Sequence, residues 1–365
     1  MIRSSKHILK YQTNIKTDWL DKLFIDYKIT LQEYINLIWE KKLPLKRFLS
    51  TKDCPTGYPI SSGHWKSIVY KNASEIVRGC IKKKRKKCPQ VENIAINLDC
   101  NVFNIQKDGN EFDEFIQLRL PYLYRYGKQN LRQKINIPIK HHKHSLRFIN
   151  WDRKNTLKLT KTNNNYYLIF TYEKATPKIK SKGKSIGIDQ GYKKLLALST
   201  GKIIGNNFNK IYEDISRKKQ RSKNFNQALI ERDNKINELL NKELPTRGIN
   251  RIIIEDLKGI KQGTKGKIRK TFNNKLQRWC YSKVVNRLEM FCEENGVYLQ
   301  KVSPAYTSQT CSSCGEIHKS SRVGESFECI SCGEKIDADI NASINILHRG
   351  DYNPSTKEKL TIKDS

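Results

Sequence analysis

The stretch that decides the fold is Ser185-Ile186-Gly187-Ile188-Asp189, an apolar run that ends in a carboxylate. Two further acidic islands follow along the chain: Ile252-Ile253-Ile254-Glu255-Asp256-Leu257 and Asp337-Ala338-Asp339-Ile340-Asn341-Ala342. Carboxylates that end or interrupt apolar runs are costly to bury unless something cationic compensates them. We therefore expect a pair of divalent metal ions to compensate the acids of these three islands.

The elements around these islands predict a mixed sheet. Residues 185–188 and 195–199 flank Gly191 and predict a β-hairpin, to which residues 202–204 can add a third strand. Residues 251–255 are apolar without alternation, which is typical of a central strand covered on both faces. Further elements are predicted for the rest of this half, in chain order: a basic helical stretch in residues 212–240, a helix in residues 273–295 and a strand in residues 297–302.

This order of elements, with a final helix after the third island, predicts an RNase H-like α/β sheet. In such a sheet Asp189 lies in the middle of a strand, Glu255 ends a neighbouring strand, and Asp339 stands near the start of the last helix. The fold can therefore bring together three acids that lie far apart in sequence. Convergence on one cleft follows from the fold, because spacing alone cannot show it.

The chemistry that such a cleft supports is phosphodiester hydrolysis with two Mg²⁺ ions about 4 Å apart. Asp189 is expected to bridge both ions, with Glu255 and Asp339 each holding mainly one, since hard cations prefer carboxylate oxygens. Asp256 and Asp337 are the nearest competitors, as surface groups or as groups that position the other acids. The alternative interpretation is that each acid is a helix cap or a turn residue.

Four cysteines precede the third island and form two CxxC pairs with 14 residues between them: Cys311, Cys314, Cys329 and Cys332. Thiolates at this spacing predict a closed, tetrahedral zinc site with a structural role, and the alternative is a pair of redox dithiols. Glycine follows each pair, at Gly315 and Gly333, and permits a tight turn. Because the cluster lies next to the helix of Asp339, loss of zinc should also disorder that acid.

The N-terminal half predicts a different architecture. Residues 6–13 suggest a short strand, and residues 17–87 a small helical insert with capping boxes at Thr30–Glu33 and Asn72–Glu75. Strand-like runs with period two follow, at residues 94–102, 115–120, 134–139, 157–160 and 166–172. Pro138 favours an edge strand, and the three asparagines at residues 163–165 favour a hairpin turn. These runs predict an antiparallel barrel or sandwich.

The charge balance indicates a polyanionic partner. The chain has 70 Lys and Arg against 36 Asp and Glu, a net charge of +34, and a nucleic acid is the simplest partner. An AT-rich genome, which favours Lys and Asn codons, explains part of the lysine count but not the shortage of acids. Two basic runs are candidate nucleic-acid contacts, with solvated flexible runs as the alternative. They comprise Lys82, Lys83, Lys84, Arg85, Lys86 and Lys87, and Arg217, Lys218, Lys219 and Arg221.

No segment approaches 18 consecutive apolar residues, and the N-terminus leads into polar chain. We therefore expect a soluble, cytoplasmic protein that associates with the nucleoid. Residues 351–365 are polar and lack apolar periodicity, which predicts a disordered tail.

Several motifs together resemble the TnpB proteins of bacterial insertion sequences, compact RNA-guided nucleases related to type V CRISPR effectors. They are the residues 187–191, 254–257, 306–311 and 337–343 and the paired CxxC motifs. The resemblance covers roughly residues 130–348, whereas the first 90 residues resemble the family only in layout.

The resemblance implies an α+β multidomain protein. Its expected parts are a wedge-like β-barrel in residues 1–16 and 88–180, a helical recognition insert in residues 17–87, a RuvC-like nuclease in residues 181–305 and 336–350, a target-binding zinc ribbon in residues 306–335, and the tail. It also implies Asp189, Glu255 and Asp339 as catalytic, magnesium-binding acids and the four cysteines as zinc ligands.

The implied function is RNA-guided cleavage of double-stranded DNA next to a short transposon-associated motif, with one protein copy per guide RNA or a dimer. The stretch between the first two acids is short, and the arginine-rich helix usual there is diluted to residues 217–223, which weakens the expectation of contacts at that helix. The alternatives are a compact type V CRISPR-like effector, an RNA-guided DNA-binding repressor without cleavage, and a zinc-ribbon nucleic-acid-binding or transposition accessory protein.

Overall fold

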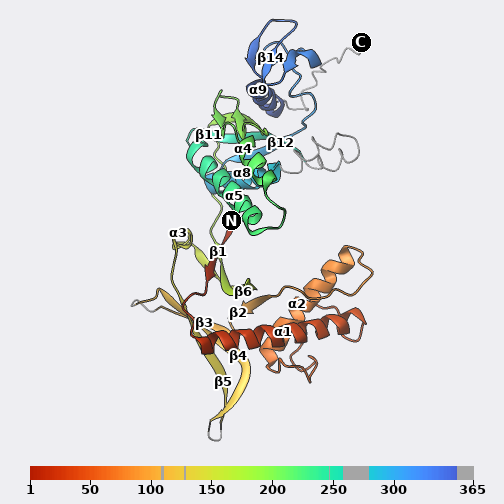
Figure 1. The fold of residues 1–365 in the computed structure, drawn as a ribbon, viewed down its shortest axis with the longest axis vertical. Coiled ribbons are helices and arrows are strands. Elements are labelled where there is room, and N and C mark those ends of the chain that lie inside the picture. The colour runs from red at the N-terminus through yellow and green to blue at the C-terminus, as the bar shows by residue number, and fades with distance from the viewer. Residues whose placement is uncertain (108–110, 127–128, 246, 258–278, 352–365) are drawn as a thin grey trace. The chain divides into compact units, whose positions relative to one another are not determined.

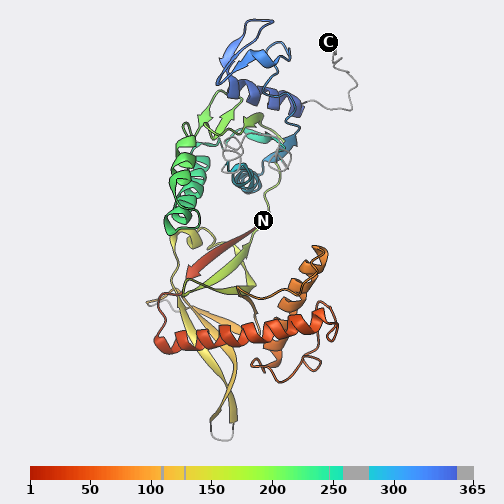
Figure 2. The same ribbon diagram turned by 45° about the vertical axis from the view of Figure 1, so that its right-hand side comes forward.

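The computed structural model describes residues 1–107, 111–126, 129–245, 247–257 and 279–351, and Figures 1 and 2 show it as a ribbon. The chain divides into two compact units, Met1–Ala175 and Thr176–Ser365. No helix among the described residues has the length and apolar character needed to cross a membrane.

The first unit contains two antiparallel sheets. One has the strand order β1-β7-β6-β2 and the other the order β3-β4-β5. The bounds of the strands are β1 Ile2–Ile8, β2 Ala95–Asp99, β3 Phe103–Lys107, β4 Glu114–Tyr126, β5 Gln129–Ile139, β6 Asp152–Thr162 and β7 Asn165–Glu173. A short helix, α3 (Lys143–Leu146), lies between β5 and β6. The alternating strands β2, β4, β5, β6 and β7 therefore form where the period-two pattern predicts them, whereas the pattern misses β3, which begins after the predicted run at residues 94–102.

Two local predictions in these sheets are confirmed. Pro138 lies in β5, which is an edge strand, so its missing N–H group removes no bond from a central ladder. Asn163 and Asn164 adopt positive φ angles of 48° and 61° between β6 and β7, as the two-residue hairpin turn requires.

Two long helices accompany these sheets: α1 (Asn14–Trp39) and α2 (Gly63–Lys82). Both predicted capping boxes are wrong, because Thr30 and Asn72 lie inside the helices. The Thr30 hydroxyl donates instead to the Asp26 carbonyl oxygen at 2.8 Å, and the N-cap of α1 is Thr13. A local Ser/Thr-x-x-Glu pattern cannot start a helix where the apolar face already continues on both sides.

The second unit is built on a five-stranded mixed sheet with the order β10-β9-β8-β11-β12. Its strands are β8 Lys184–Asp189, β9 Leu196–Leu198, β10 Ile203–Ile204, β11 Ile249–Glu255 and β12 Tyr298–Val302. The first three pair antiparallel, whereas β11 runs parallel to both β8 and β12. The three isoleucines at residues 252–254 are all buried, which explains the apolar run without alternation.

The helices of this unit are α4 (Asn209–Arg217), α5 (Lys223–Glu243), α8 (Tyr281–Asn295) and α9 (Ala338–Asp351). The prediction of one continuous helix in residues 212–240 is wrong, because the chain leaves the helix at Lys218 and re-enters it after Ser222. The basic run therefore lies at a break between helices, where Arg221 has a φ angle of 66°.

Residues 273–278 of the next predicted helix and residues 352–365 of the predicted tail lie outside the described residues.

Helix α9 packs directly on β8, and the small size of Gly187 makes this contact possible. A Cβ atom at Gly187 would lie 2.1 Å from the Ser343 carbonyl oxygen and 2.7 Å from the Leu347 amide nitrogen of α9. Such distances exclude any side chain, so the sequence Gly187-Ile188-Asp189 combines a close helix contact with an acid two residues later. The start of α9 is thereby held near the end of β8.

A small three-stranded sheet precedes α9. Its antiparallel strands are β13 (Arg322–Val323), β14 (Ser326–Glu328) and β15 (Lys335–Asp337), with a short 3₁₀ helix, η1 (Lys319–Ser321), before them. Phe327 is fully buried and packs with Cys311, Cys329 and Ala338 in a core of its own. This core joins the cysteine segment to the first residue of α9.

Candidate functional site

The parallel pair β8 and β11 brings two of the three acids to one edge of the sheet. Asp189 is the last residue of β8 and Glu255 the last residue of β11, so the prediction that Asp189 lies in mid-strand is wrong. The register pairs Ile188 with Ile254, and the two acids directly follow this pair. Parallel strands point their carboxyl ends the same way, so both acids lie at the same end of the sheet.

The third acid, Asp339, lies in the first turn of α9. Asp337 caps this helix, because its Oδ1 atom accepts hydrogen bonds from the amides of Asp339 (3.0 Å) and Ile340 (3.2 Å). A carboxylate at this position satisfies amide groups that no helical carbonyl reaches, and the helix dipole favours its charge. Asp337 is therefore a positioning group, one of the two roles that the sequence left open for it.

The negative charges of Glu255 and Asp339 both act on Asp189. The pKa of Asp189 is raised to about 8, first by burial and then by the negative charges of Glu255 and Asp339, with Arg322 acting in the opposite direction. Burial also raises the pKa of Glu255. Desolvated carboxylates that repel one another are stabilised by a shared cation. This donor set fits a hard divalent ion.

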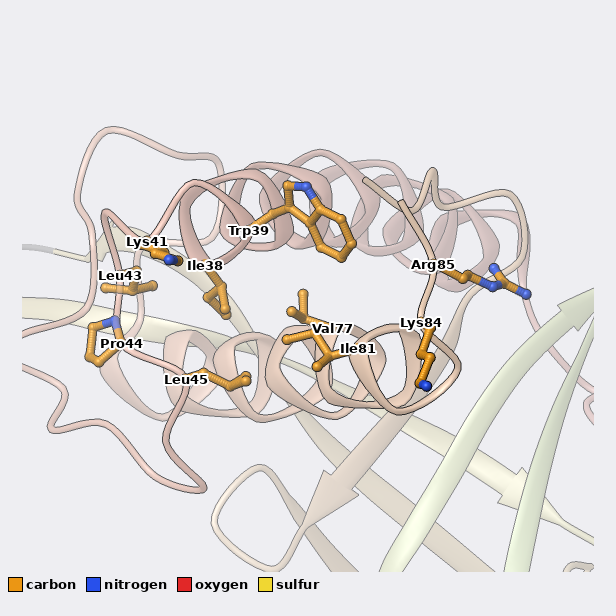
Figure 3. Close-up of a pocket in the computed structure, with 10 residues that line it drawn as sticks. All are labelled: Ile38, Trp39, Lys41, Leu43, Pro44, Leu45, Val77, Ile81, Lys84 and Arg85. Carbon is orange, nitrogen blue, oxygen red and sulfur yellow. The ribbon is translucent and has the colours of Figure 1, made fainter. Parts of the chain in front are cut away.

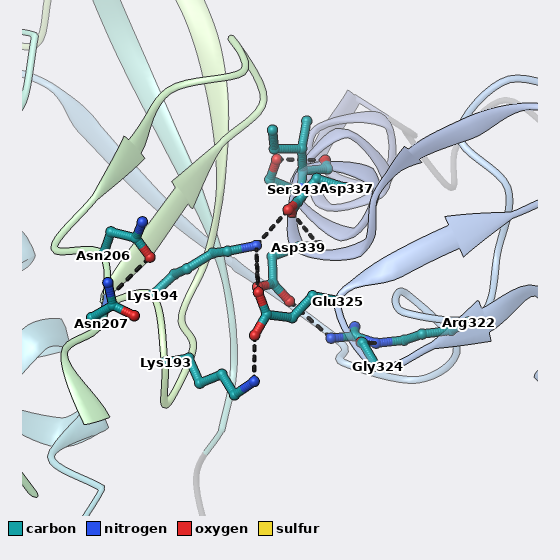
Figure 4. A network of polar contacts seen from close by, with 11 residues as sticks. Lys193, Lys194, Asn206, Asn207, Arg322, Gly324, Glu325, Asp337, Asp339 and Ser343 are labelled. Carbon is teal, nitrogen blue, oxygen red and sulfur yellow. Dashed lines mark hydrogen bonds and ion pairs between the residues drawn. The ribbon is translucent and has the colours of Figure 1, made fainter. Parts of the chain in front are cut away.

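Two cations of the chain itself hold Asp339 (Figure 4). The Lys194 ammonium group lies 3.4 Å from Oδ2 of Asp339 and also pairs with Asp337, while Nη2 of Arg322 lies 2.8 Å from Oδ1 of Asp339. The side chain of Lys194 is only 6% exposed. Burial alone would lower its pKa, but the carboxylates of Asp337 and Asp339 raise it overall. Both oxygens of Asp339 are thus engaged.

Sequence reasoning missed Lys194 and Arg322. In a chain with 70 Lys and Arg, a single lysine five residues after Asp189 carries no special signal. Arg322 lies in β13 between the two cysteine pairs, and only the tertiary structure brings it to Asp339.

A buried threonine fixes the second acid. The Thr307 hydroxyl donates to Oε1 of Glu255 at 2.5 Å, and Thr307 is 2% exposed. This bond lowers the pKa of Glu255 and so partly offsets the larger effect of burial. The segment that leads into the cysteine cluster therefore also orients a carboxylate of the sheet.

The four cysteines form a compact cluster whose ligand atoms all lie within 4.8 Å of one another. The Sγ atoms of Cys311 and Cys332 are 3.7 Å apart, and those of Cys314 and Cys329 are 3.6 Å apart. Four sulfurs bound tetrahedrally to zinc at about 2.3 Å would lie about 3.8 Å from one another. The geometry therefore fits a closed zinc site.

The turns after each cysteine pair support this assignment. Gly315 and Gly333 have φ angles of 80° and 76°, and each donates its amide to the carbonyl of the first cysteine of its pair at 3.0 Å. The backbone amide of Cys332 lowers the pKa of Cys329, whereas the pKa values of Cys314 and Cys332 in the same cluster are raised, so the assignment rests on the turn geometry. Among the described residues, no other group of three or more His, Cys, Asp or Glu side chains has its ligand atoms this close together. The carboxylates of Asp189, Glu255 and Asp339 therefore do not form such a tight group.

Two asparagines of α9 connect the cysteine cluster to the acids. The Asn341 side chain donates to the Thr310 carbonyl at 2.8 Å and accepts from the Ser312 amide at 2.9 Å. The Asn345 side chain donates to the carbonyls of Thr307 and Thr310 at 3.0 and 2.6 Å. Both asparagines are buried. Sequence reasoning missed their role: Asn345 lies outside the third island, and Asn341 appears only as part of it. The segment 307–312 is thereby tied to the helix that carries Asp339.

The predicted nucleic-acid contacts lie on the surface of both units. Lys82 ends α2, and the whole basic run 82–87 is exposed. In the second unit, Arg217, Lys219 and Arg221 are exposed at the break between α4 and α5, while Lys218 pairs with Asp214 at 2.5 Å. Contact of these residues with a nucleic acid stays a prediction.

The C-terminal part of the chain matches a known family model. Residues 281–346 match the Cas12f1-like TNB domain. The CRISPR-associated endodeoxyribonuclease Cas12f1 of Sulfoacidibacillus thermotolerans is 42% identical over 72 residues, which are 20% of this chain and 17% of that protein. A TnpB-like protein of Aquifex aeolicus is 36% identical over 107 residues, 28% of this chain and 34% of that protein. The matched stretches thus span about a third or less of these relatives.

Two solved structures share the fold over most of the chain. The Cas12f1 complex with single-guide RNA and target DNA superposes with a TM-score of 0.56 at 15% identity, covering 93% of this chain and 82% of that one. CasPhi-2 (Cas12j) bound to crRNA gives a TM-score of 0.51 at 10% identity, covering 95% and 98%. The chain therefore has a mixed α+β fold like that of Cas12 effectors.

Proposed function

We propose that this chain, a TnpB-family protein related to the type V CRISPR effectors, is an RNA-guided DNA endonuclease that cuts next to a short transposon-associated motif. The observation that carries the proposal is the placement of three acids from three separate elements: Asp189 and Glu255 end paired parallel strands, and Asp339 lies in the first turn of α9, which packs on β8. The match to the Cas12f1-like TNB domain supports the same function, and so does the net charge of +34, because a polyanionic guide and target need cationic partners.

We also propose that the sheet β10-β9-β8-β11-β12 with α9 is an RNase H-like nuclease domain of the RuvC type. The antiparallel three-stranded start followed by two parallel strands supports this assignment, as does the position of the acids at strand ends. In the first unit, the two antiparallel sheets would form the wedge-like domain and α1 with α2 the recognition insert.

The proposed reaction needs a hard cation at the three carboxylates. Two Mg²⁺ ions, when bound, would supply an activated water and stabilise the leaving 3′ oxygen. Asp189, Glu255 and Asp339 would hold these ions, and Thr307 would orient Glu255. Arg322 and Lys194 engage both oxygens of Asp339, so they would compete with a bound cation for this carboxylate.

The cysteine cluster would hold one zinc ion with a structural role. Asn341 and Asn345 tie the segment that enters the cluster to α9, so the zinc site would fix the direction of Asp339. The target DNA and the guide RNA would lie along the exposed basic runs, with one protein copy per guide RNA.

The proposal is tested by purifying the chain from cells that carry its native flanking DNA and sequencing the RNA that copurifies. A defined RNA should be recovered, and the complex should cut DNA matched to it only when Mg²⁺ is present. RNA recovery without cleavage would favour an RNA-guided repressor. Absence of any bound RNA would contradict the proposal and favour a zinc-ribbon accessory protein.

A further inference from the structure

Helices α1 and α2 and the segments that follow them line an open, mostly apolar cavity of about 530 Å³ in the first unit, far in sequence from the acids. Figure 3 shows Trp39 facing Val77 and Ile81 across this cavity, with Leu43 and Pro44 closing one end. The size lies within the range of ligand pockets, which are mostly apolar with a few polar groups at the edge. Ile81 is 54% exposed, so the apolar wall is open to solvent.

The charged groups at the cavity are all cationic. Lys41 lies at one end and Lys84 and Arg85 at the other (Figure 3), and no described residue that lines the cavity carries a carboxylate. The nearest acid in sequence, Glu40, pairs with Lys42 at 2.7 Å. An apolar slot with cations at both ends is complementary to a flat base whose ribose carries a phosphate on its 5′ and 3′ sides.

The two lysines occupy an unusual backbone position. Lys41 and Lys84 each follow the cap of their helix with positive φ angles of 60° and 53°. Their amides bond to the carbonyls of Ile38 (3.1 Å) and Ile81 (2.9 Å), the closing bonds of a helix end. Glycine or asparagine usually fills this position because a Cβ atom is unfavourable there. The chain places a lysine there twice, at one cavity.

We infer that this cavity, here called the Trp39 pocket, captures an unpaired base of the guide RNA. The base would stack on the Trp39 indole, and its two flanking phosphates would meet Lys41 on one side and Lys84 with Arg85 on the other. The exposed run 82–87, which contains Lys84 and Arg85, would continue the contact along the RNA backbone. The inference rests on the proposed function, because a bound guide supplies the RNA.

An RNA occupant is favoured over duplex DNA for a physical reason. Bases in a duplex are stacked and paired, whereas single-stranded loops and ends of RNA expose a face that an aromatic side chain can stack on. The polyanionic backbone of RNA also matches cations at both ends of the cavity better than an apolar protein segment would.

The first test uses the complete complex of protein and RNA. The chain is expressed in cells fed 4-thiouridine, purified with its RNA and irradiated, and the crosslinked peptides are identified by mass spectrometry. Crosslinks are expected at Trp39 or on the α2 segment around Ile81. Ile81→Asp should remove them, whereas Ile29→Asp should keep them, because Ile29 is similarly exposed (47%) on α1 but does not line the cavity. RNA recovered with crosslinks only elsewhere would overturn the pocket assignment and leave the proposed function standing.

The second test separates the pocket from the proposed function. Binding of a ten-nucleotide RNA to the RNA-free full chain is compared with binding of the same RNA lacking its central base. The intact RNA should bind roughly 5-fold or more tightly, as expected for one stacked base, and the ratio should fall to near 1 in Trp39→Ala and Ile81→Asp. A ratio near 1 in the unmodified chain, or an unchanged ratio in Ile81→Asp, would overturn the inference. A larger ratio for the matching DNA pair would overturn the assignment to RNA.

Discussion

The ammonium group of Lys194 lies 3.4 Å from Oδ2 of Asp339 and occupies the space between the sheet and the first turn of α9. A nearly buried lysine thus holds a proposed catalytic acid through its charge. The chain supplies this cation itself, so the acids can assemble before any metal binds. Lys194 is in this sense a positioning residue for Asp339 and Asp337.

Removal of this cation should destabilise the protein most when no divalent ion is present. Lys194→Ala removes the ion pair of Asp337 and one of the two cations at Asp339, and we expect a loss of about 1–3 kcal/mol in unfolding free energy without added Mg²⁺. Mg²⁺ should reduce this loss because it can replace the ammonium charge. Urea denaturation of both proteins, with and without Mg²⁺, measures the difference.

Lys193→Ala is the matched control. Lys193 is 63% exposed and pairs with Glu325 on the surface, so its loss should change stability by less than about 0.5 kcal/mol. If both variants lose the same amount, or if Mg²⁺ makes no difference to Lys194→Ala, Lys194 does not act as the counter-ion of the acids.

The contact between β8 and α9 predicts a large effect of one methyl group. Gly187→Ala places a Cβ atom against the backbone of Ser343 and Leu347, which cannot yield as a flexible side chain can. We expect a loss of about 1–3 kcal/mol or more, together with loss of cleavage as Asp339 moves away from Asp189. Thermal unfolding and a cleavage assay on the same preparation measure both.

Gly79→Ala gives the opposite expectation. Gly79 lies inside α2, and a Cβ atom added there would have no neighbouring atom within 4 Å, so alanine should stabilise the helix by about 0.5–1 kcal/mol. If Gly187→Ala and Gly79→Ala changed the unfolding free energy equally, the close contact between Gly187 and α9 would not be what positions this helix.

The pH dependence of stability should report the charge of Asp189. A carboxyl group whose pKa is raised in the folded state contributes stability that is present below its unfolded pKa of about 4 and is lost as pH rises through about 8. Without added Mg²⁺, Asp189→Asn should therefore become progressively more stable than the unmodified chain as pH rises from about 4 to about 8, by on the order of a few kcal/mol in unfolding free energy.

At high pH, Mg²⁺ should reduce the difference in unfolding free energy between Asp189→Asn and the unmodified chain. The cation favours the ionised carboxylate, which asparagine cannot supply. Urea midpoints at several pH values test both statements. A constant difference between the two proteins across this pH range would mean that Asp189 ionises with an ordinary pKa.

Zinc removal should also displace Asp339, because Asn341 connects the cysteine segment to the helix that carries this acid. Chelation of the metal, or Cys329→Ser, should lower the melting temperature and abolish cleavage together, since the segment 307–312 holds both the cluster and α9. Asn341→Ala should keep its zinc, lose about 1–3 kcal/mol because buried backbone groups lose their partner, and lower cleavage. Metal content, melting temperature and cleavage rate are measured on each protein. Cleavage at the full rate by a zinc-free chain would contradict the proposed connection between the zinc site and the position of Asp339.

The sequence predicted those parts of the fold and site that depend on local pattern. The apolar run before Glu255 identified a central strand, and the CxxC spacing identified the cysteine cluster, because each pattern reflects a short-range requirement. Helix boundaries were less accurate: the box at Thr30 lies inside α1, and the basic run at Arg221 lies between two helices. In both places tertiary packing decides whether the helix continues, and local signals do not report it.

Residues that act through distant partners could not be found in this way. Lys194 meets an acid 145 positions later, and Asn341 meets carbonyl and amide groups about 30 positions earlier. Neither has a neighbour in sequence that marks its role. Their functions become visible only when the strand end, the cysteine segment and the helix start are seen together.

The most direct test of the account compares cleavage by four single variants of the purified RNA complex in Mg²⁺. Asp189→Ala, Glu255→Ala and Asp339→Ala should each lower the rate by on the order of 100-fold or more while retaining the bound RNA, and Asp256→Ala should stay near the unmodified rate. Full-rate cleavage by any of the first three variants would contradict the claim that these acids form one catalytic site.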